Sequence, residues 1–117
     1  MAGMDGIEVT FDRPRRLRYS IRALRELCTS LGGITLLDLL QRLGGIDLNA
    51  LNAAIRYGLL HEDPKMTPKQ AEVLLEAHIA KHGNITRIND AIATLINESG
   101  LISREPELGE AGGDRSA

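Results

Sequence analysis

The stretch that decides the fold runs from Asp47 to His82 and reads DLNALNAAIRYGLLHEDPKMTPKQAEVLLEAHIAKH. Apolar residues recur in it at steps of three and four, first over residues 48–59 and again over 71–79, which is the period of an amphipathic helix. Pro64 disfavours a helical conformation at the residue before it and has no amide proton to extend a helix. We therefore expect two helices joined by a sharp polar corner.

The second of these helices has a strong start signal. Thr67 offers a hydroxyl at the N-cap, Pro68 suits the first helical position, and Gln70 stands where a side chain reaches back to close a capping box. The sequence therefore predicts that the chain re-enters a helix at Pro68.

A β-hairpin is expected upstream. Apolar and polar residues alternate over residues 7–11 and again over 17–19, as in half-buried strands, and the DRPR sequence at 12–15 is typical of a tight turn. A hairpin alone is marginally stable in water. The hairpin over residues 7–19 must therefore pack its apolar face on the helices that follow.

Three further helices complete the prediction. Ser20 is a good N-cap for a helix from Ile21 to about Leu31, which a glycine pair ends. A short helix over 36–43 is apolar on nearly all sides, which indicates deep burial or an interface. The last helix is expected from Ile85 to about Ser99.

The sequence thus predicts a mainly α fold, in which an N-terminal β-hairpin packs on a compact bundle of about five helices. A chain of 117 residues has room for one core, which we assign to a single domain over residues 7–99. Residues 1–6 are expected to be disordered. Residues 100–117 are rich in glycine and acidic side chains and poor in apolar ones, so we expect a flexible tail.

Composition narrows the functional classes. A single cysteine excludes an internal disulfide, and the N-terminus has no signal-peptide pattern, so we expect a cytoplasmic protein. No apolar run approaches the ~20 residues that span a bilayer, so no membrane association is expected. The net charge of −2 says little about partners.

Catalytic motifs are missing from the sequence. The glycine pairs lack the spacing of a phosphate loop or a dinucleotide fingerprint, and Cys28 falls on the apolar side of its helix, where a core role is expected. We therefore expect no enzyme and no cofactor. His78 and His82 are four residues apart, but Ile79 stands where a metalloprotease motif requires glutamate. We expect a hydrogen-bonded His78 and no metal site.

A dense run of arginines lies in the hairpin and the first helix. Six guanidinium groups within thirteen residues suit phosphate binding, and this makes a small nucleic-acid-binding or regulatory protein the alternative function. The chain has only three aromatic residues for base stacking, which makes nucleic acid the weaker hypothesis. Two other roles are open for the arginines. They could line a solvated strand edge that discourages aggregation, or they could bind an acidic segment of a partner protein. This arginine segment comprises Arg13, Arg15, Arg16, Arg18, Arg22 and Arg25.

The short helix over 36–43 has more leucine than one core-facing stripe requires, and the surplus predicts a second partner surface, although core packing is the ordinary role of leucine. The residues expected to bind a partner are Arg15, Arg16, Arg18, Arg22, Arg25, Leu36, Leu37, Leu40 and Leu43.

The polar corner has a distinctive pattern. An aromatic residue, glycine and leucine end the helix before it, HEDP forms it, and Met-Thr restarts the chain; the residues are Tyr57, Gly58, Leu59, His61, Glu62, Asp63, Pro64, Met66 and Thr67. Three features precede this corner pattern: the hairpin, a helix that contains a leucine pair, and an Asp-Leu helix cap. This order of elements over residues 7–98 resembles the tail assembly chaperones of long-tailed bacteriophages, which include counterparts in gene transfer agents. Two places depart from the pattern of this family, which usually has acidic residues there. They are residues 28–31 before Gly32, and Lys69-Gln70 after Thr67.

The resemblance implies a non-catalytic protein that binds the tape-measure protein during tail morphogenesis, with the tail tube protein as a second candidate partner. It also implies work in the cytoplasm of a bacterial host and leaves self-association open. Family members are often made in two lengths by frameshifting near the C-terminus, and this sequence would be the short form.

Overall fold

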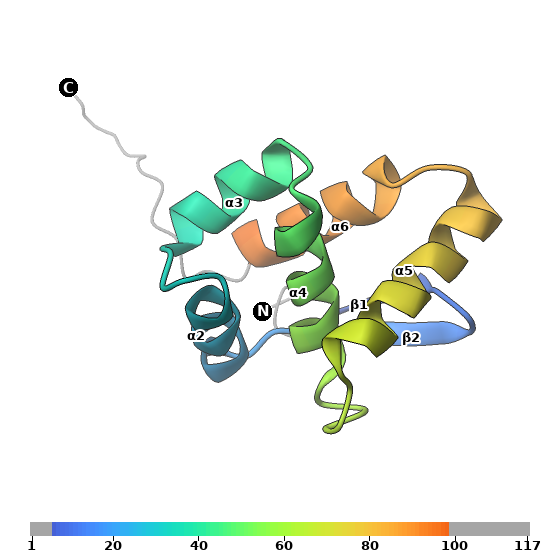
Figure 1. The fold of residues 1–117 in the computed structure, drawn as a ribbon, viewed down its shortest axis with the longest axis horizontal. Helices are drawn as coiled ribbons and strands as arrows, with labels where there is room; N and C mark the ends of the chain where they lie inside the picture. Colours follow the sequence, from blue (N-terminus) through green and yellow to red (C-terminus); the bar gives the residue numbers. More distant parts are fainter. Residues whose placement is uncertain (1–5, 99–117) are drawn as a thin grey trace.

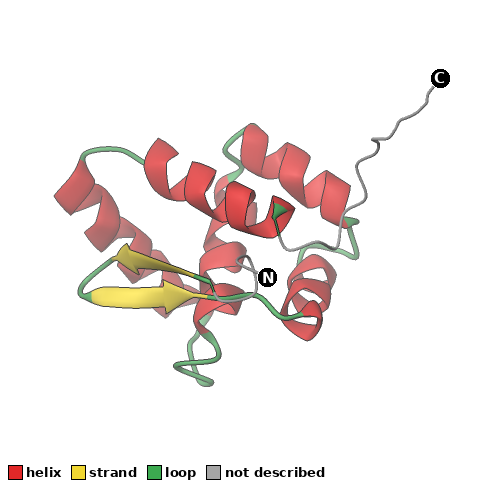
Figure 2. Cartoon of the chain, turned by 180° about the vertical axis from the view of Figure 1, so that it is seen from behind, coloured by secondary structure: helices red, strands yellow, loops and turns green. Residues whose placement is uncertain are grey.

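The computed structural model describes residues 6–98, which form a two-stranded hairpin followed by five helices. The predicted mainly α fold with an N-terminal hairpin is therefore confirmed (Figures 1 and 2). The predicted disordered N-terminus, apart from Gly6, and the predicted tail lie outside the described residues. The elements are β1 (Ile7–Thr10), β2 (Pro14–Leu17), α2 (Ile21–Ser30), α3 (Leu36–Gly44), α4 (Leu48–Leu59), α5 (Pro68–His82) and α6 (Thr86–Asn97).

Helix α4 lies at the centre of the fold. It packs against β2 and against each of the other four helices, α2, α3, α5 and α6 (Figure 1). Its residues Leu51, Ala54, Ile55 and Leu59 are fully buried, as their helical spacing predicts. The stretch that decides the fold thus supplies the element on which the others assemble.

The predicted helix starts are confirmed by hydrogen bonds. Ser20 Oγ accepts from the Ala23 amide at 3.0 Å. Thr67 Oγ1 accepts from the Gln70 amide at 3.1 Å, while Gln70 Oε1 accepts from the Thr67 amide at 2.9 Å, which closes the expected capping box. These local bonds satisfy amide groups that a helix cannot pair internally.

The hairpin is antiparallel, with Ile7 opposite Leu17 and Thr10 opposite Pro14. The prediction of a turn over residues 12–15 is wrong in detail, because Pro14 already begins β2. A proline is tolerated there since it opposes Thr10 at a position that needs no amide donor. The predicted packing of the hairpin is confirmed: Leu17 and Tyr19 are buried, and the Tyr19 hydroxyl donates to the Ala54 carbonyl at 2.6 Å.

The polar corner after α4 is held by its own residues. The Glu62 and Asp63 amides donate to the Leu59 carbonyl, and the Met66 amide donates to the Asp63 carbonyl. Met66 is 2% exposed, and its carbonyl accepts from Arg56 Nε at 2.8 Å. The corner therefore returns the chain to the core before α5 begins.

Helix α3 differs from its prediction. It is amphipathic rather than apolar on nearly all sides, since Leu39 and Leu43 are buried while Asp38 and Arg42 are exposed. Asn89 of α6, which is 2% exposed, donates through Nδ2 to the Leu43 carbonyl. Helices α3 and α6 are thus joined by apolar packing and by one buried hydrogen bond.

Among residues 6–98, no helix combines the length and the apolar character needed to cross a bilayer.

Candidate partner-binding surfaces

The structure separates the four leucines expected to bind a partner. Leu43 is 0% exposed, so its prediction as a contact residue is wrong. It belongs to the buried core, and its helix α3 packs against α4 and α6. Leu36 and Leu40 are half-buried and pack against the core, whereas Leu37 is 60% exposed. Only Leu37 therefore offers a largely open side chain to a partner.

The arginines divide by their contacts. Arg15 forms two hydrogen bonds with the Asp12 carboxylate, and Arg22 pairs with Glu26 at 3.2 Å. Arg16 donates to the Gly6 carbonyl at 3.3 Å. Within residues 6–98, the side chains of Arg18 and Arg25 form no ion pair or hydrogen bond. The positive charge most available to a partner therefore lies on the exposed Arg18 and Arg25, and less on Arg15.

The pair between Asp12 and Arg15 fixes the turn of the hairpin. The hydrogen bond from Arg15 holds the pKa of the Asp12 carboxyl at about 2, below its usual value of 3.8. Arg15 is 11% exposed at its side chain while Asp12 is 48% exposed. Water screens the carboxylate, so the contribution to stability is expected to be at most about 1 kcal/mol.

Asp12→Asn is expected to lower stability by at most about 1 kcal/mol at neutral pH and by clearly less at pH 2. A carboxyl with a lowered folded-state pKa stabilises the fold fully above its unfolded pKa, and this contribution shrinks as the pH falls below about 4 and is lost only below the folded pKa of about 2. Urea unfolding of both proteins at several pH values measures the difference. A difference that persists unchanged at pH 2 would show that lost packing, and not the ion pair, is responsible.

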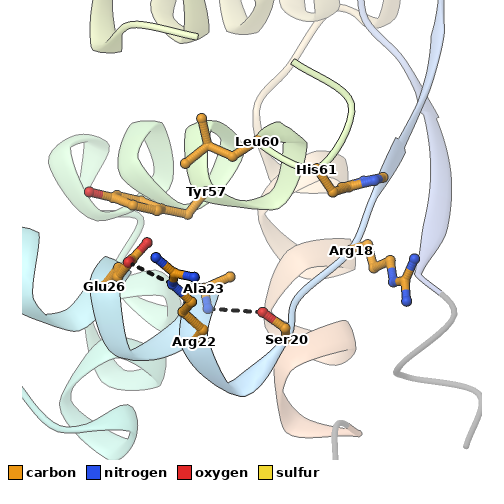
Figure 3. Close-up of a pocket in the computed structure, with 8 residues that line it drawn as sticks. All are labelled: Arg18, Ser20, Arg22, Ala23, Glu26, Tyr57, Leu60 and His61. Atoms are coloured by element: carbon orange, nitrogen blue, oxygen red, sulfur yellow. Dashed lines mark hydrogen bonds and ion pairs between the residues drawn. The ribbon is translucent and has the colours of Figure 1, made fainter. Parts of the chain in front are cut away.

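A groove joins the arginine segment to the polar corner. Its volume is about 470 Å³, and it lies between the N-terminal half of α2, the chain before it, and the end of α4 (Figure 3). Arg18, Ser20 and Arg22 come from one side, and Tyr57 and Leu60 from the other (Figure 3). The lining residues are Arg18, Ser20, Arg22, Ala23, Glu26, Tyr57, Leu60 and His61. We call it the arginine groove.

Two residues of the corner pattern are fixed at this groove. His61 Nε2 lies 2.7 Å from the Arg16 carbonyl, and since a carbonyl only accepts, Nε2 is the protonated nitrogen. The Tyr57 hydroxyl accepts from Arg56 Nη1 at 3.2 Å, and the Arg56 guanidinium lies 5.0 Å from the Tyr57 ring centroid. The groove thus combines cationic side chains with an oriented aromatic ring and an apolar Leu60.

The other candidate chemistry lies elsewhere. His78 is 3% exposed and Nδ1 donates to the Thr10 carbonyl at 2.9 Å, so the expected hydrogen bond is confirmed. The His82 ring lies beside the His78 ring, with ring centroids 4.4 Å apart. The third histidine, His61, is hydrogen-bonded to the Arg16 carbonyl of β2. In the part of the chain that the structure describes, no three histidine, cysteine, aspartate or glutamate side chains are placed to share a metal ion.

Cys28 is 8% exposed and belongs to the core, as expected. Burial raises the pKa of its thiol, which keeps it protonated and a poor nucleophile at neutral pH.

Sequence reasoning missed several exposed apolar side chains. Ile21 next to the arginine groove is 61% exposed, Leu48 at the start of α4 is 60% exposed and Val73 on α5 is 52% exposed. Leu48 also lines a groove of about 380 Å³ between α4 and α5, with Leu75, Ile79 and Ile85. The periodic pattern that places Leu48 on the apolar stripe gives no signal for its exposure, because the stripe extends beyond the point where a neighbouring helix covers it.

Comparisons of the chain with protein-family models, with curated proteins and with solved structures found no match.

Proposed function

We propose that this protein is a non-catalytic tail assembly chaperone of a long-tailed bacteriophage or a related gene transfer agent. It binds the tape-measure protein in the cytoplasm of the bacterial host while the tail is built, and the tail tube protein is a second candidate partner. The proposal starts from the corner pattern and from the order of elements over residues 7–98.

The observation that carries the proposal is the composition of the arginine groove. Tyr57 and His61 of the corner pattern line the same groove as Arg18 and Arg22. The pattern therefore does more than terminate a helix, since it places an aromatic ring and a histidine beside two guanidinium groups. Such a groove suits a polypeptide segment with both acidic and apolar side chains, because charge directs the approach and apolar contact adds affinity.

The remaining residues of the pattern support the fold around this groove. Leu59 is fully buried, Gly58 allows close packing and Thr67 caps α5. These three residues therefore hold the end of α4, which forms one side of the groove, and the start of α5. Exposed apolar residues such as Ile21 and Leu37 add surface that an unassembled helical partner could cover.

The test is co-purification of the full chain with a candidate tape-measure polypeptide. In the double variant Arg18→Glu with Arg22→Glu, capture is expected to fall at least about tenfold, because two attractive charges become repulsive. Neither residue is part of the core, so thermal unfolding should change little.

The matched control is Lys69→Glu with Lys81→Glu, which makes the same change of charge on exposed residues of α5 outside the arginine groove. Capture by this control should equal that of the unmodified chain. Equal loss in both variants would assign the effect to net charge, and no capture by the unmodified chain would reject the proposed partner.

One observation favours a second candidate, a small nucleic-acid-binding protein. Arg13, Arg18 and Arg25 form no side-chain ion pair within residues 6–98, so they are available for phosphates. Titration of DNA binding against salt decides between the two. A steep fall of affinity with salt concentration, corresponding to several neutralised phosphates, would replace the chaperone proposal.

A further inference from the structure

A long groove runs between strand β1 and helix α6. It consists of two cavities of about 490 Å³ and 240 Å³ that share Ile7, Arg87 and Ala91. The first reaches Gly6 and Glu98 at one end, and the second reaches His78 and His82 at the other. We call the combined cavity the β1–α6 groove. It is separate from the arginine groove.

One side of the groove is an incompletely paired strand edge. The Phe11 amide donates to the Arg13 carbonyl across the hairpin. Hydrogen-bonded and non-hydrogen-bonded pairs alternate along an antiparallel ladder, so Glu8 and Thr10 belong to the non-hydrogen-bonded pairs and direct their backbone groups away from β2. The Thr10 carbonyl accepts from His78. Within the described residues no hydrogen bond reaches the Glu8 backbone or the Thr10 amide from this side.

The outer edge of β2 is treated differently. The Arg16 carbonyl lies 2.7 Å from His61 Nε2, and the Arg18 amide donates to the Gly58 carbonyl at 2.9 Å. The corner therefore bonds β2 at Arg16, and the end of α4 continues this pairing beyond the strand at Arg18. Since exposed backbone edges readily pair with a further strand, the open edge of β1 is the place where one can be added.

The lining of the groove suits an extended apolar segment. Ala91 is half-buried and lies between the more deeply buried Ile88 and Leu95, which gives an apolar wall on α6. His78 adds an unusual feature at the far end: it is 3% exposed, and its Nε2 atom has no hydrogen-bond partner. A buried unpaired acceptor costs stability, which a donor entering the groove would recover.

We propose that the β1–α6 groove is occupied by this chain's own residues 100–105, Gly-Leu-Ile-Ser-Arg-Glu, added to β1 as a third strand. Helix α6 ends at Asn97, and Glu98 already lines the groove. Gly100 permits the chain reversal that follows a helix. Because side chains alternate along a strand, one of Leu101 and Ile102 would face the apolar wall, and Ser103 would supply a hydroxyl donor.

Length and charge agree with this occupant. From Glu98 to Arg87 the groove follows α6 for eleven residues, about 17 Å at the helical rise, and residues 100–105 extended as a strand would cover about 17 Å. The segment leaves α6 at the end where β1 begins, so it lies parallel to β1. Arg104 and Glu105 then arrive near Glu8 and Arg87, whose charges are opposite. The inference does not rest on the proposed function.

The experiment is amide hydrogen exchange of the full chain, followed residue by residue by NMR without any partner. The Glu8 and Thr10 amides are expected to be protected in the unmodified protein. In the double variant Leu101→Asp with Ile102→Asp they should exchange at least about tenfold faster, while core amides of α4 keep their protection. The matched control, Leu108→Asp, lies beyond the segment and should change nothing.

A variant of the groove provides a second measurement. Ala91→Arg fills the groove from α6 and should also accelerate exchange at Glu8 and Thr10, whereas Ala80→Arg, on an exposed position of α5, should not. Equal exchange in the unmodified chain and the Leu101→Asp/Ile102→Asp variant would overturn the proposal. Protection that rises with protein concentration would assign the groove to a second copy, and protection only with an added tape-measure polypeptide would assign it to that partner; either result also overturns it.

Discussion

Gly58→Ala is expected to lower the free energy of unfolding by about 2 kcal/mol, as overpacking of a tight core does. A Cβ atom at Gly58 would lie 2.7 Å from Leu17 Cδ2 and 2.9 Å from the Tyr19 hydroxyl oxygen. Tyr19 has little freedom to move, because it is 1% exposed and its hydroxyl is bonded to the Ala54 carbonyl. Urea unfolding followed by circular dichroism measures the change.

Whether Gly58→Ala raises or lowers the free energy of unfolding shows whether packing or helix propensity dominates at this position. Alanine is favoured over glycine inside a helix by about 0.5–1 kcal/mol, so propensity alone predicts that Gly58→Ala stabilises the protein. Gly44→Ala is the matched control, since Gly44 also lies in a helix but a Cβ atom there meets nothing within 4 Å. Stabilisation by both substitutions would contradict the close contact between α4 and the hairpin.

Leu43→Ala is expected to cost about 2–5 kcal/mol of unfolding free energy, because it opens a cavity in the core. Leu43 is 0% exposed, and its carbonyl accepts the buried hydrogen bond from Asn89. Leu37→Ala, on the same helix, should change stability by no more than about 0.5 kcal/mol, since Leu37 is 60% exposed. Thermal or urea unfolding compares the two variants.

The same pair of variants tests whether Leu37 contacts a partner and whether Leu43 only supports the core. Capture of the tape-measure polypeptide should fall in Leu37→Ala while its stability is unchanged. Leu43→Ala should reduce capture only because a smaller fraction of the protein is folded, and the folded molecules should bind as before. A large loss of stability in Leu37→Ala, or none in Leu43→Ala, would mean that the orientation of α3 is wrong.

Much of the local structure follows from neighbouring residues. Ser20, Thr35 and Thr67 each place a hydroxyl within reach of an amide three residues later, and this bond depends on few residues outside the helix start. The corner after Leu59 is equally local, because Pro64 blocks a continuous helix. Such features are predictable since the interacting groups are close in the chain.

The candidate site was only partly predictable. The sequence identified Arg18 and Arg22 as candidate contacts and Tyr57 and His61 as part of a pattern, but it gave no reason to place them in one groove. They meet because the end of α4 lies beside the chain that leads into α2. The ion pairs of the arginine segment, in contrast, are local, since Arg15 pairs with Asp12 three residues before it and Arg22 with Glu26 four residues after it.

The sequence by itself determined the helix–corner–helix, the caps and the presence of a hairpin, because periodicity, proline and capping hydroxyls act within one or two helical turns. Tertiary structure decided which apolar residues are buried, since Leu43 and Leu37 have the same side chain and lie on the same helix, yet Leu43 is buried and Leu37 is 60% exposed. It also decided that the corner and α4 bond the chain at Arg16 and Arg18 while β1 faces a groove, because backbone pairing across long separations depends on where the chain returns.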